Sequence, residues 1–227
     1  SNSHFSWLGQ SKPSTESISS SVVLSNCFFM AVASKAQEVE HVVLYSMLLS
    51  QAAHLIQAKQ LETNLDARRA QPMKFTCPVH IAQIPFEINT LLELYSTWKP
   101  KRVLELGTER GGTLWVWLQY GHPQATIVCV DHFREWVDNR KIFPSWKQPG
   151  QTLIPVQGDM TDHSVVGAAK QHGPYDWVLI DADPHYAAVK RDFYLYKDCV
   201  APGGVLLFHD ITPNPKEDIE VWHFFRE

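Results

Sequence analysis

Short apolar runs recur along the second half of the chain, and each is closed by glycine, proline or acidic turn residues. A run of this length without polar interruption predicts a strand that is buried on both faces, as in a parallel sheet. The five runs lie at residues 102–106, 125–130, 152–156, 177–180 and 205–208. Helical spacing between them predicts helices near residues 111–120, 133–140, 162–171 and 185–199. This alternation predicts an α/β fold with a doubly wound, mainly parallel sheet.

The first part of the chain follows a different pattern. Residues 35–69 contain no glycine or proline, and apolar side chains recur every three or four residues from Leu44 to Leu55. That spacing predicts a long amphipathic helix within an N-terminal helical extension, residues 35–83. We interpret this helix as packed on the body of the fold, as a lid, or as the contact of a homodimer. A shorter helix is predicted over residues 86–98.

Residues 1–34 form a serine-rich N-terminal segment. Its apolar stretch is too polar to span a bilayer. The stretch ends in Ala31 to Ala33, which resembles a signal-peptide cleavage site, but the only preceding cation, Lys12, is offset by Glu16. Secretion is therefore disfavoured, and Met30 is a candidate native start.

The composition narrows the classes of protein to consider. A chain of 227 residues with 44% hydrophobic and 19% charged residues fits one compact domain, which we place at residues 84–227. Its 20 Lys and Arg against 24 Asp and Glu leave no basic surplus for nucleic acid or an anionic membrane. The four cysteines lie far apart without a C-x-x-C pair, which is typical of reduced thiols and favours a cytoplasmic location.

Polar or glycine residues follow every one of the five predicted strands. Ligands of doubly wound sheets bind beyond the carboxyl ends of the strands, where the strand order reverses. These groups therefore predict one binding site. In chain order they are the turn from Glu105 to Thr113, Asp131, Gly158 with Asp159, Asp181 to Asp183, and His209 with Asp210.

The turn after the first strand is not the dinucleotide fingerprint, because Glu109 stands where G-x-G-x-x-G requires its second glycine. A nucleotide-dependent oxidoreductase on the same architecture is thus disfavoured. The acidic residue ahead of the glycine, Glu105, suits a cationic ligand such as an ammonium or sulfonium. Asp131 is suited to accept hydrogen bonds from two ribose hydroxyls.

These residues resemble the class I S-adenosylmethionine-dependent methyltransferases over roughly residues 84–227. The runs RVLELGTERGGT, IVCVDHF and VQGDM are similar to their first three motifs. The resemblance implies a Rossmann-like sheet of the methyltransferase type and S-adenosylmethionine as cofactor. It also implies cofactor contacts: Glu105, Gly107, Thr108 and Gly111 at the methionine end, Asp131 at the ribose, and His132, Phe133 and Asp159 at the adenine.

A narrower resemblance lies in the run YDWVLIDADPHYAAVKRDFYLYKDCVAPGGVLLFHDI, from Tyr175 to Ile211. It is similar to metal-dependent O-methyltransferases of catechols, sugars and macrolides and to cephalosporin-hydroxylase-like proteins. That resemblance implies a divalent cation, usually Mg²⁺, held by Asp181, His209 and Asp210. Here a histidine replaces the first member of an acidic pair, and imidazole suits Mn²⁺ or Fe²⁺ better. His209 is therefore a ligand, a hydrogen-bond partner of a ligand, or an acid-base residue on the acceptor side.

The implied activity is transfer of a methyl group to a hydroxyl oxygen of a small molecule, a catechol, sugar or polyketide. A sulfonium carries an activated methyl, so the protein must mainly align the acceptor and lower its proton affinity. We assign catalytic roles to Asp181, His209 and His185, the last as general base, although His185 also fits an exposed helix start. The alternative is a non-catalytic cofactor-binding regulatory or scaffold relative, which the histidine at position 209 favours.

The expected sheet has an edge at its fifth strand. Methyltransferases of this class normally continue through a helix into an antiparallel strand pair, whereas the given sequence stops inside the helix predicted around residues 217–227. An open edge exposes unpaired backbone groups, so we expect another segment to cover it. The helix over residues 35–69 is one candidate.

Overall fold

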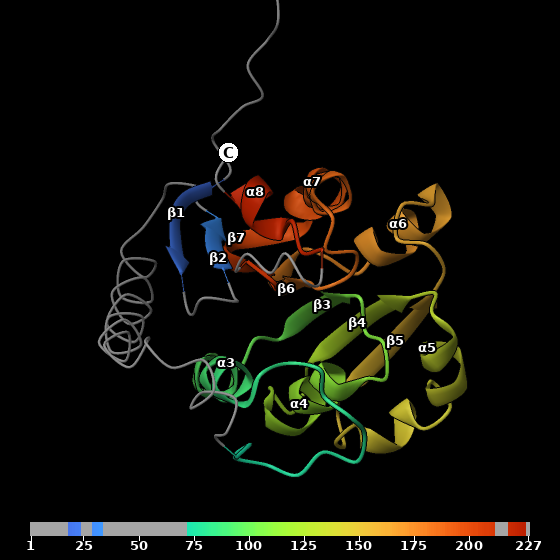
Figure 1. The fold of residues 1–227 in the computed structure, drawn as a ribbon. Coiled ribbons are helices and arrows are strands. Elements are labelled where there is room, and N and C mark those ends of the chain that lie inside the picture. The colour runs from blue at the N-terminus through green and yellow to red at the C-terminus, as the bar shows by residue number, and fades with distance from the viewer. Residues whose placement is uncertain (1–17, 24–28, 34–71, 212–217, 226–227) are drawn as a thin grey trace, which may run out of the picture.

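The computed structural model describes residues 18–23, 29–33, 72–211 and 218–225 (Figure 1). Its centre is a sheet of seven strands in the order β1-β2-β7-β6-β3-β4-β5. The strands are β1 (Ile18–Val23), β2 (Phe29–Ala33), β3 (Arg102–Leu106), β4 (Thr126–Asp131), β5 (Thr152–Gln157), β6 (Tyr175–Ile180) and β7 (Val200–Phe208). The strands from β5 across to β7 are parallel, which confirms the predicted doubly wound sheet.

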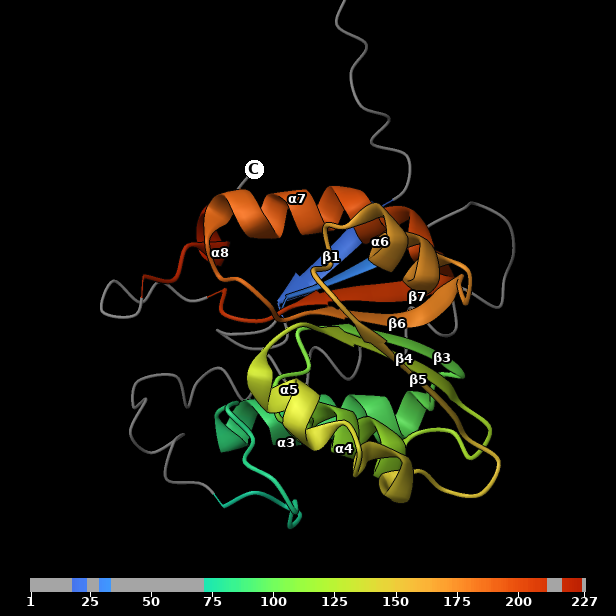
Figure 2. The same ribbon diagram turned by 90° about the vertical axis from the view of Figure 1, so that its right-hand side faces the viewer.

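Helices cover both faces of the sheet (Figure 2). One face carries α3 (Pro85–Trp98), α4 (Gly112–Tyr120) and α5 (Arg134–Asn139), and the other carries α6 (His163–Lys170), α7 (Tyr186–Tyr196) and α8 (Val221–Phe225). Two 3-10 helices, η3 (Phe143–Trp146) and η4 (Lys197–Cys199), precede β5 and β7. The elements predicted between residues 86 and 208 are confirmed. The long helix predicted over residues 35–69 lies outside the described residues.

The core has two halves, one on each side of the sheet. Val103 and Ile127 pack with residues of α3 and α4, whereas their neighbours Leu104 and Val128 pack with residues of α6 and α7. Successive strand residues point to opposite faces, so a strand covered on both sides needs apolar residues throughout. For this reason the strands could be predicted from continuous apolar runs in the sequence.

An antiparallel hairpin of N-terminal residues covers the edge of β7. Strand β2 pairs with β7 from Phe29 opposite Phe208 to Val32 opposite Val205, and β1 pairs with β2. Strands β1 and β2 therefore cover this edge, and the helix predicted over residues 35–69 lies outside the described residues. They complete the hydrogen-bond ladder that β7 would otherwise leave open.

Strand β3 lies where the strand order reverses, with β4 and β5 on one side and β6 and β7 on the other. Hydrogen bonds continue past the strand ends: Gly107 donates to the Val130 carbonyl at 3.0 Å and Asp181 to the Leu106 carbonyl at 2.9 Å. The residues after neighbouring strands are thereby held side by side. Among the described residues, no helix combines the length and apolar character needed to cross a bilayer.

Candidate active site

A cavity of about 470 Å³ opens at the carboxyl ends of the parallel strands. Its wall comes from the turn after β3, the ends of β4, β6 and β7, and the segment ahead of α3. This is the place that the reversal of strand order predicts for a ligand. The predicted site residues that line it are Gly107, Thr108, Asp131, Phe133, Asp181, His209 and Asp210.

The turn after β3 requires glycine at position 107. Gly107 has a φ of 88°, and a Cβ atom placed on it would lie 1.9 Å from the backbone oxygen of Asp181. The turn can therefore pass close to the end of β6 only because it lacks a side chain there. Gly111, the N-cap residue of α4, packs under the rings of Phe143 and Trp146 and does not line the cavity.

Glu105 lies beneath the cavity wall instead of in it. The side chain is fully buried and accepts hydrogen bonds from the hydroxyl of Thr113, from Trp117 Nε1 at 3.3 Å and from Thr108 Oγ1 at 3.4 Å. Burial raises the pKa of Glu105 to about 8, against the opposing effect of these donors. Glu105, which we predicted to contact the methionine end, does not line the cavity. Glu105 positions Thr108 and Thr113, and those two residues line the cavity.

Asp131 stands at the end of β4 with its carboxylate fixed by the backbone. One oxygen accepts the N–H groups of His132 at 2.6 Å and Phe133 at 2.8 Å, and the other accepts the Glu109 N–H at 2.6 Å. These bonds tie β4 to the glycine turn and leave acceptor capacity for a ligand. The stacked rings of His132 and Phe133 follow, 4.9 Å apart, with Phe133 at the cavity and 55% exposed.

Asp159 does not reach the cavity in this structure. Its exposed carboxylate accepts hydrogen bonds from the backbone N–H of Thr161 at 2.8 Å and from the Thr161 hydroxyl at 2.7 Å. These bonds lower the pKa of Asp159. His132 is also exposed and outside the cavity wall. Of the three residues assigned to the adenine, the structure thus places Phe133 alone at the cavity.

Three predicted metal ligands meet at the cavity. Asp181, His209 and Asp210 each offer one ligand atom, and these atoms lie within 4.8 Å of one another. His209 Nδ1 is 3.0 Å from Asp181 Oδ1 and 3.2 Å from Asp210 Oδ1. The cluster is the only group of this kind within the described residues.

This cluster fits a divalent cation. Burial alone would lower the pKa of His209, but the carboxylates of Asp181 and Asp210 raise it well above its usual value. A cation bound here must displace that proton, as metal binding to histidine generally does. One imidazole nitrogen with two carboxylates is a donor set that suits Mn²⁺ or Fe²⁺ as well as Mg²⁺.

His185, the predicted general base, lies away from the cavity. It precedes α7 as its N-cap residue, and its ring pairs with Asp183 through Nδ1 and lies 3.6 Å from Asp218 Oδ2 through Nε2. Half of its side chain is exposed. This placement agrees with the other interpretation of His185, an exposed residue at a helix start.

Two polar residues of the cavity wall were not predicted. Gln83 donates a hydrogen bond from Nε2 to Asp181 Oδ2 at 2.7 Å, and His80 lies at the cavity on the same segment. Gln83 is 98 positions from Asp181 in sequence and forms no motif with it. No spacing rule could have brought the two together.

Comparison with known proteins identifies the part of the chain that forms most of this cavity. Residues 104–211 match a family model described as a methyltransferase domain. The chain is similar to an O-methyltransferase from Bacillus cereus solved with S-adenosylhomocysteine, with 14% identity and a TM-score of 0.51 over 84% of this chain and 79% of that one. Residues 104–211 therefore resemble a methyltransferase domain.

The chain is also similar to the O-methyltransferase TomG from Streptomyces achromogenes, with 15% identity and a TM-score of 0.49 over 66% of this chain and 70% of that one. No curated protein matches the sequence. Within the matched residues 104–211 lie the glycine turn, Asp131 and the Asp181–His209–Asp210 cluster. His80 and Gln83 lie outside these residues and complete the cavity wall.

Proposed function

We propose that this protein transfers the methyl group of S-adenosylmethionine to a hydroxyl oxygen of a small molecule, with a divalent cation at Asp181, His209 and Asp210. The observation that carries the proposal is that one cavity holds the glycine turn, Asp131 and this three-residue cluster. A methyl donor and an oxygen acceptor must meet in one space, with their reacting atoms in line. The shared fold with an O-methyltransferase supports this proposal.

The cofactor half of the cavity has the chemistry that the donor requires. The fixed carboxylate of Asp131 is placed to accept the ribose hydroxyls, and Phe133 offers a ring face to the adenine. The first residues of α4, Gly112 and Thr113, line the cavity, so the helix N-terminus is available to the carboxylate of the methionine end. S-adenosylmethionine supplies the activated methyl group.

The other half holds the acceptor. A divalent cation at Asp181, His209 and Asp210 would lower the proton affinity of an acceptor hydroxyl. The three side chains are 13% to 31% exposed, so they are partly shielded from water yet open to the cavity. We favour an acceptor with two neighbouring oxygens, such as a catechol or a vicinal diol, because it can occupy two positions on one cation.

A histidine at the cavity can receive the acceptor proton. His80 lines the cavity, whereas His185 pairs with Asp183 outside it. A general base must come within hydrogen-bond reach of the proton that it removes. We therefore assign this role to His80 in place of His185.

The proposal is tested by methyl transfer. The protein is incubated with methyl-labelled S-adenosylmethionine and a panel of catechols, sugars and polyketide alcohols, with Mn²⁺, with Mg²⁺ and with a chelator. We expect labelled product and released S-adenosylhomocysteine from at least one acceptor, with turnover reduced at least tenfold by the chelator.

Two other outcomes would contradict the proposal. Binding of S-adenosylhomocysteine without turnover on any acceptor would favour a non-catalytic regulatory or scaffold relative. Calorimetric binding of NAD in place of S-adenosylhomocysteine would favour an oxidoreductase.

A further inference from the structure

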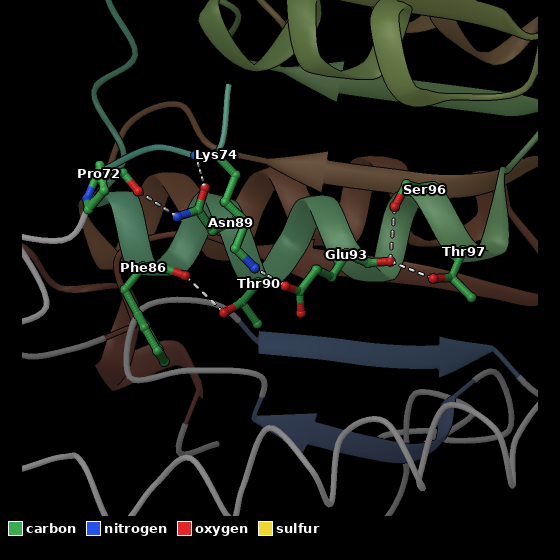
Figure 3. A network of polar contacts seen from close by, with 8 residues as sticks. All are labelled: Pro72, Lys74, Phe86, Asn89, Thr90, Glu93, Ser96 and Thr97. Atoms are coloured by element: carbon green, nitrogen blue, oxygen red, sulfur yellow. Dashed lines mark hydrogen bonds and ion pairs between the residues drawn. The ribbon is translucent and has the colours of Figure 1, made fainter. Parts of the chain in front are cut away.

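The segment ahead of α3, residues 72–83, forms a strap that ends at the cavity. Its first residues are held by Asn89 on α3 (Figure 3). Asn89 Oδ1 accepts the backbone N–H of Lys74 at 2.9 Å, and its Nδ2 donates to the Pro72 carbonyl at 3.1 Å. Lys74 also pairs with Glu93 one turn further along the helix. A buried amide that satisfies two backbone groups fixes the course of the strap at this point.

The other end of the strap packs against the start of α4. Ile81 is 7% exposed and belongs to the apolar cluster between α3, α4 and the sheet. A Cβ atom on Gly112 would lie 2.6 Å from Ile81 Cγ1 and 2.8 Å from the His80 carbonyl oxygen. The strap thus reaches the cavity because the first residue of α4 has no side chain.

At this end Gln83 contacts Asp181. Gln83 is 8% exposed, and its amide donates to Asp181 Oδ2 at 2.7 Å. The other oxygen, Asp181 Oδ1, faces His209 Nδ1 at 3.0 Å. The two carboxylate oxygens therefore have different partners, and the amide leaves Oδ1 directed at the cluster.

We propose that Gln83 is a positioning residue of the cation site: its amide holds Asp181 in the orientation that binds the ion. The inference rests on the proposed function, since it concerns the same cation. A ligand carboxylate must be held in place by a hydrogen bond to its remaining oxygen, and loss of such outer partners typically weakens metal affinity by about 10- to 100-fold. Gln83 would act on the ion through Asp181.

The test compares Gln83→Met with the wild-type protein. Methionine has nearly the length of glutamine and no amide donor, so it keeps the packing and removes the hydrogen bond. We expect the Kd for Mn²⁺, measured by calorimetry, to rise about tenfold or more. The Kd for S-adenosylhomocysteine, measured without metal, should stay within about twofold and shows that the variant is folded. Gln124→Met, at an exposed position, is the matched control and should change neither constant.

The outcomes separate this inference from the proposed function. Equal Mn²⁺ affinity of the wild-type protein and Gln83→Met would overturn the positioning role and leave the cation site intact. A parallel loss of Mn²⁺ and S-adenosylhomocysteine binding would also overturn it, because Gln83 would then support the whole cavity. A wild-type protein that binds S-adenosylhomocysteine but no Mn²⁺ would remove the cation from the proposed function itself.

Discussion

The two halves of the cavity are built in different ways. The cofactor half comes from residues close in sequence, the turn after β3 and the end of β4, and backbone N–H groups fix its key carboxylate, Asp131. The cation half joins residues from distant parts of the chain, and a side-chain amide from Gln83 fixes its key carboxylate, Asp181. A site fixed by backbone depends on strand register, whereas a site fixed by side chains depends on tertiary packing. Substitutions should therefore separate the halves.

The largest effect is expected where the halves touch. Gly107→Ala would place a Cβ atom 1.9 Å from the Asp181 backbone oxygen at a φ of 88°, so both halves must move. We expect binding of S-adenosylhomocysteine and of Mn²⁺ each to fall more than about 100-fold, and the free energy of unfolding to fall by about 3 kcal/mol. Calorimetry and urea unfolding measure these changes.

Gly167→Ala in α6 is the matched control for this substitution. A Cβ atom there meets nothing within 4 Å, so alanine should leave binding unchanged and raise stability by up to about 1 kcal/mol. If Gly107→Ala lowered the affinity for only one of the two ligands, the two halves of the cavity would move independently despite their contact at Gly107.

A reciprocal pair of substitutions tests the separation directly. Asp131→Asn should lower the affinity for S-adenosylhomocysteine about 100-fold, because the amide nitrogen cannot accept the hydrogen bonds of the ribose or the backbone. The affinity for Mn²⁺ should stay unchanged. Asp210→Asn should lower the affinity for Mn²⁺ by about 10- to 100-fold, because a charged ligand is lost. The affinity for S-adenosylhomocysteine should stay unchanged. Calorimetry with each ligand measures both. If both variants lost both ligands, the two halves would be one unit.

The same contrast explains how much of the site could be predicted from the sequence. The positions of Asp131, Asp181 and His209 followed from apolar runs, because a parallel strand buried on both faces carries its next residue to a common edge. Their grouping in one cavity confirms that reasoning. Local patterns sufficed because strand register, not side-chain packing, sets these positions.

Other features depend on tertiary packing and left no local signal. Gln83 reaches Asp181 only because the strap packs on α3 and Gly112, which no spacing rule encodes. The pairing of β2 with β7 is also a long-range contact between a serine-rich segment and the fifth parallel strand. The sequence predicts Glu105 as a cofactor contact, but in the structure Thr113 and Trp117 of α4 donate hydrogen bonds to its carboxylate.

The buried carboxyl beneath the cofactor half predicts a pH dependence of stability. Glu105 has a pKa of about 8 in the folded protein, raised by burial above its usual value of 4.5. Protonated Glu105 stabilises the folded protein. This contribution to the free energy of unfolding is complete below pH 4.5 and is lost as the pH rises to 8 and above. Glu105→Gln stays neutral throughout, so it should match the wild-type protein near pH 4.5 and exceed its stability by about 2 kcal/mol at pH 9.

Urea unfolding at the two pH values measures this difference. Glu93→Gln removes an exposed carboxylate and serves as control, with no expected change between pH 4.5 and pH 9. An equal effect of Glu105→Gln at both pH values would show that its hydrogen bonds, and not its charge, decide stability.

The smallest effect concerns the two histidines proposed for the same step. His80 lines the cavity and His185 pairs with Asp183 outside it, so His80→Ala should lower kcat about tenfold and His185→Ala less than about twofold. Neither substitution should change the affinity for S-adenosylhomocysteine or Mn²⁺ by more than about twofold. Steady-state kinetics on an acceptor found in the panel measure the difference.

Added imidazole distinguishes a proton acceptor from a residue that only shapes the cavity wall. If His80 receives the acceptor proton, imidazole in the buffer should restore part of the turnover of His80→Ala and leave that of His185→Ala unchanged. A larger loss of kcat in His185→Ala than in His80→Ala would show that His185, in the loop after β6, is the general base. The His185 ring would then have to leave Asp183, with which it pairs in this structure.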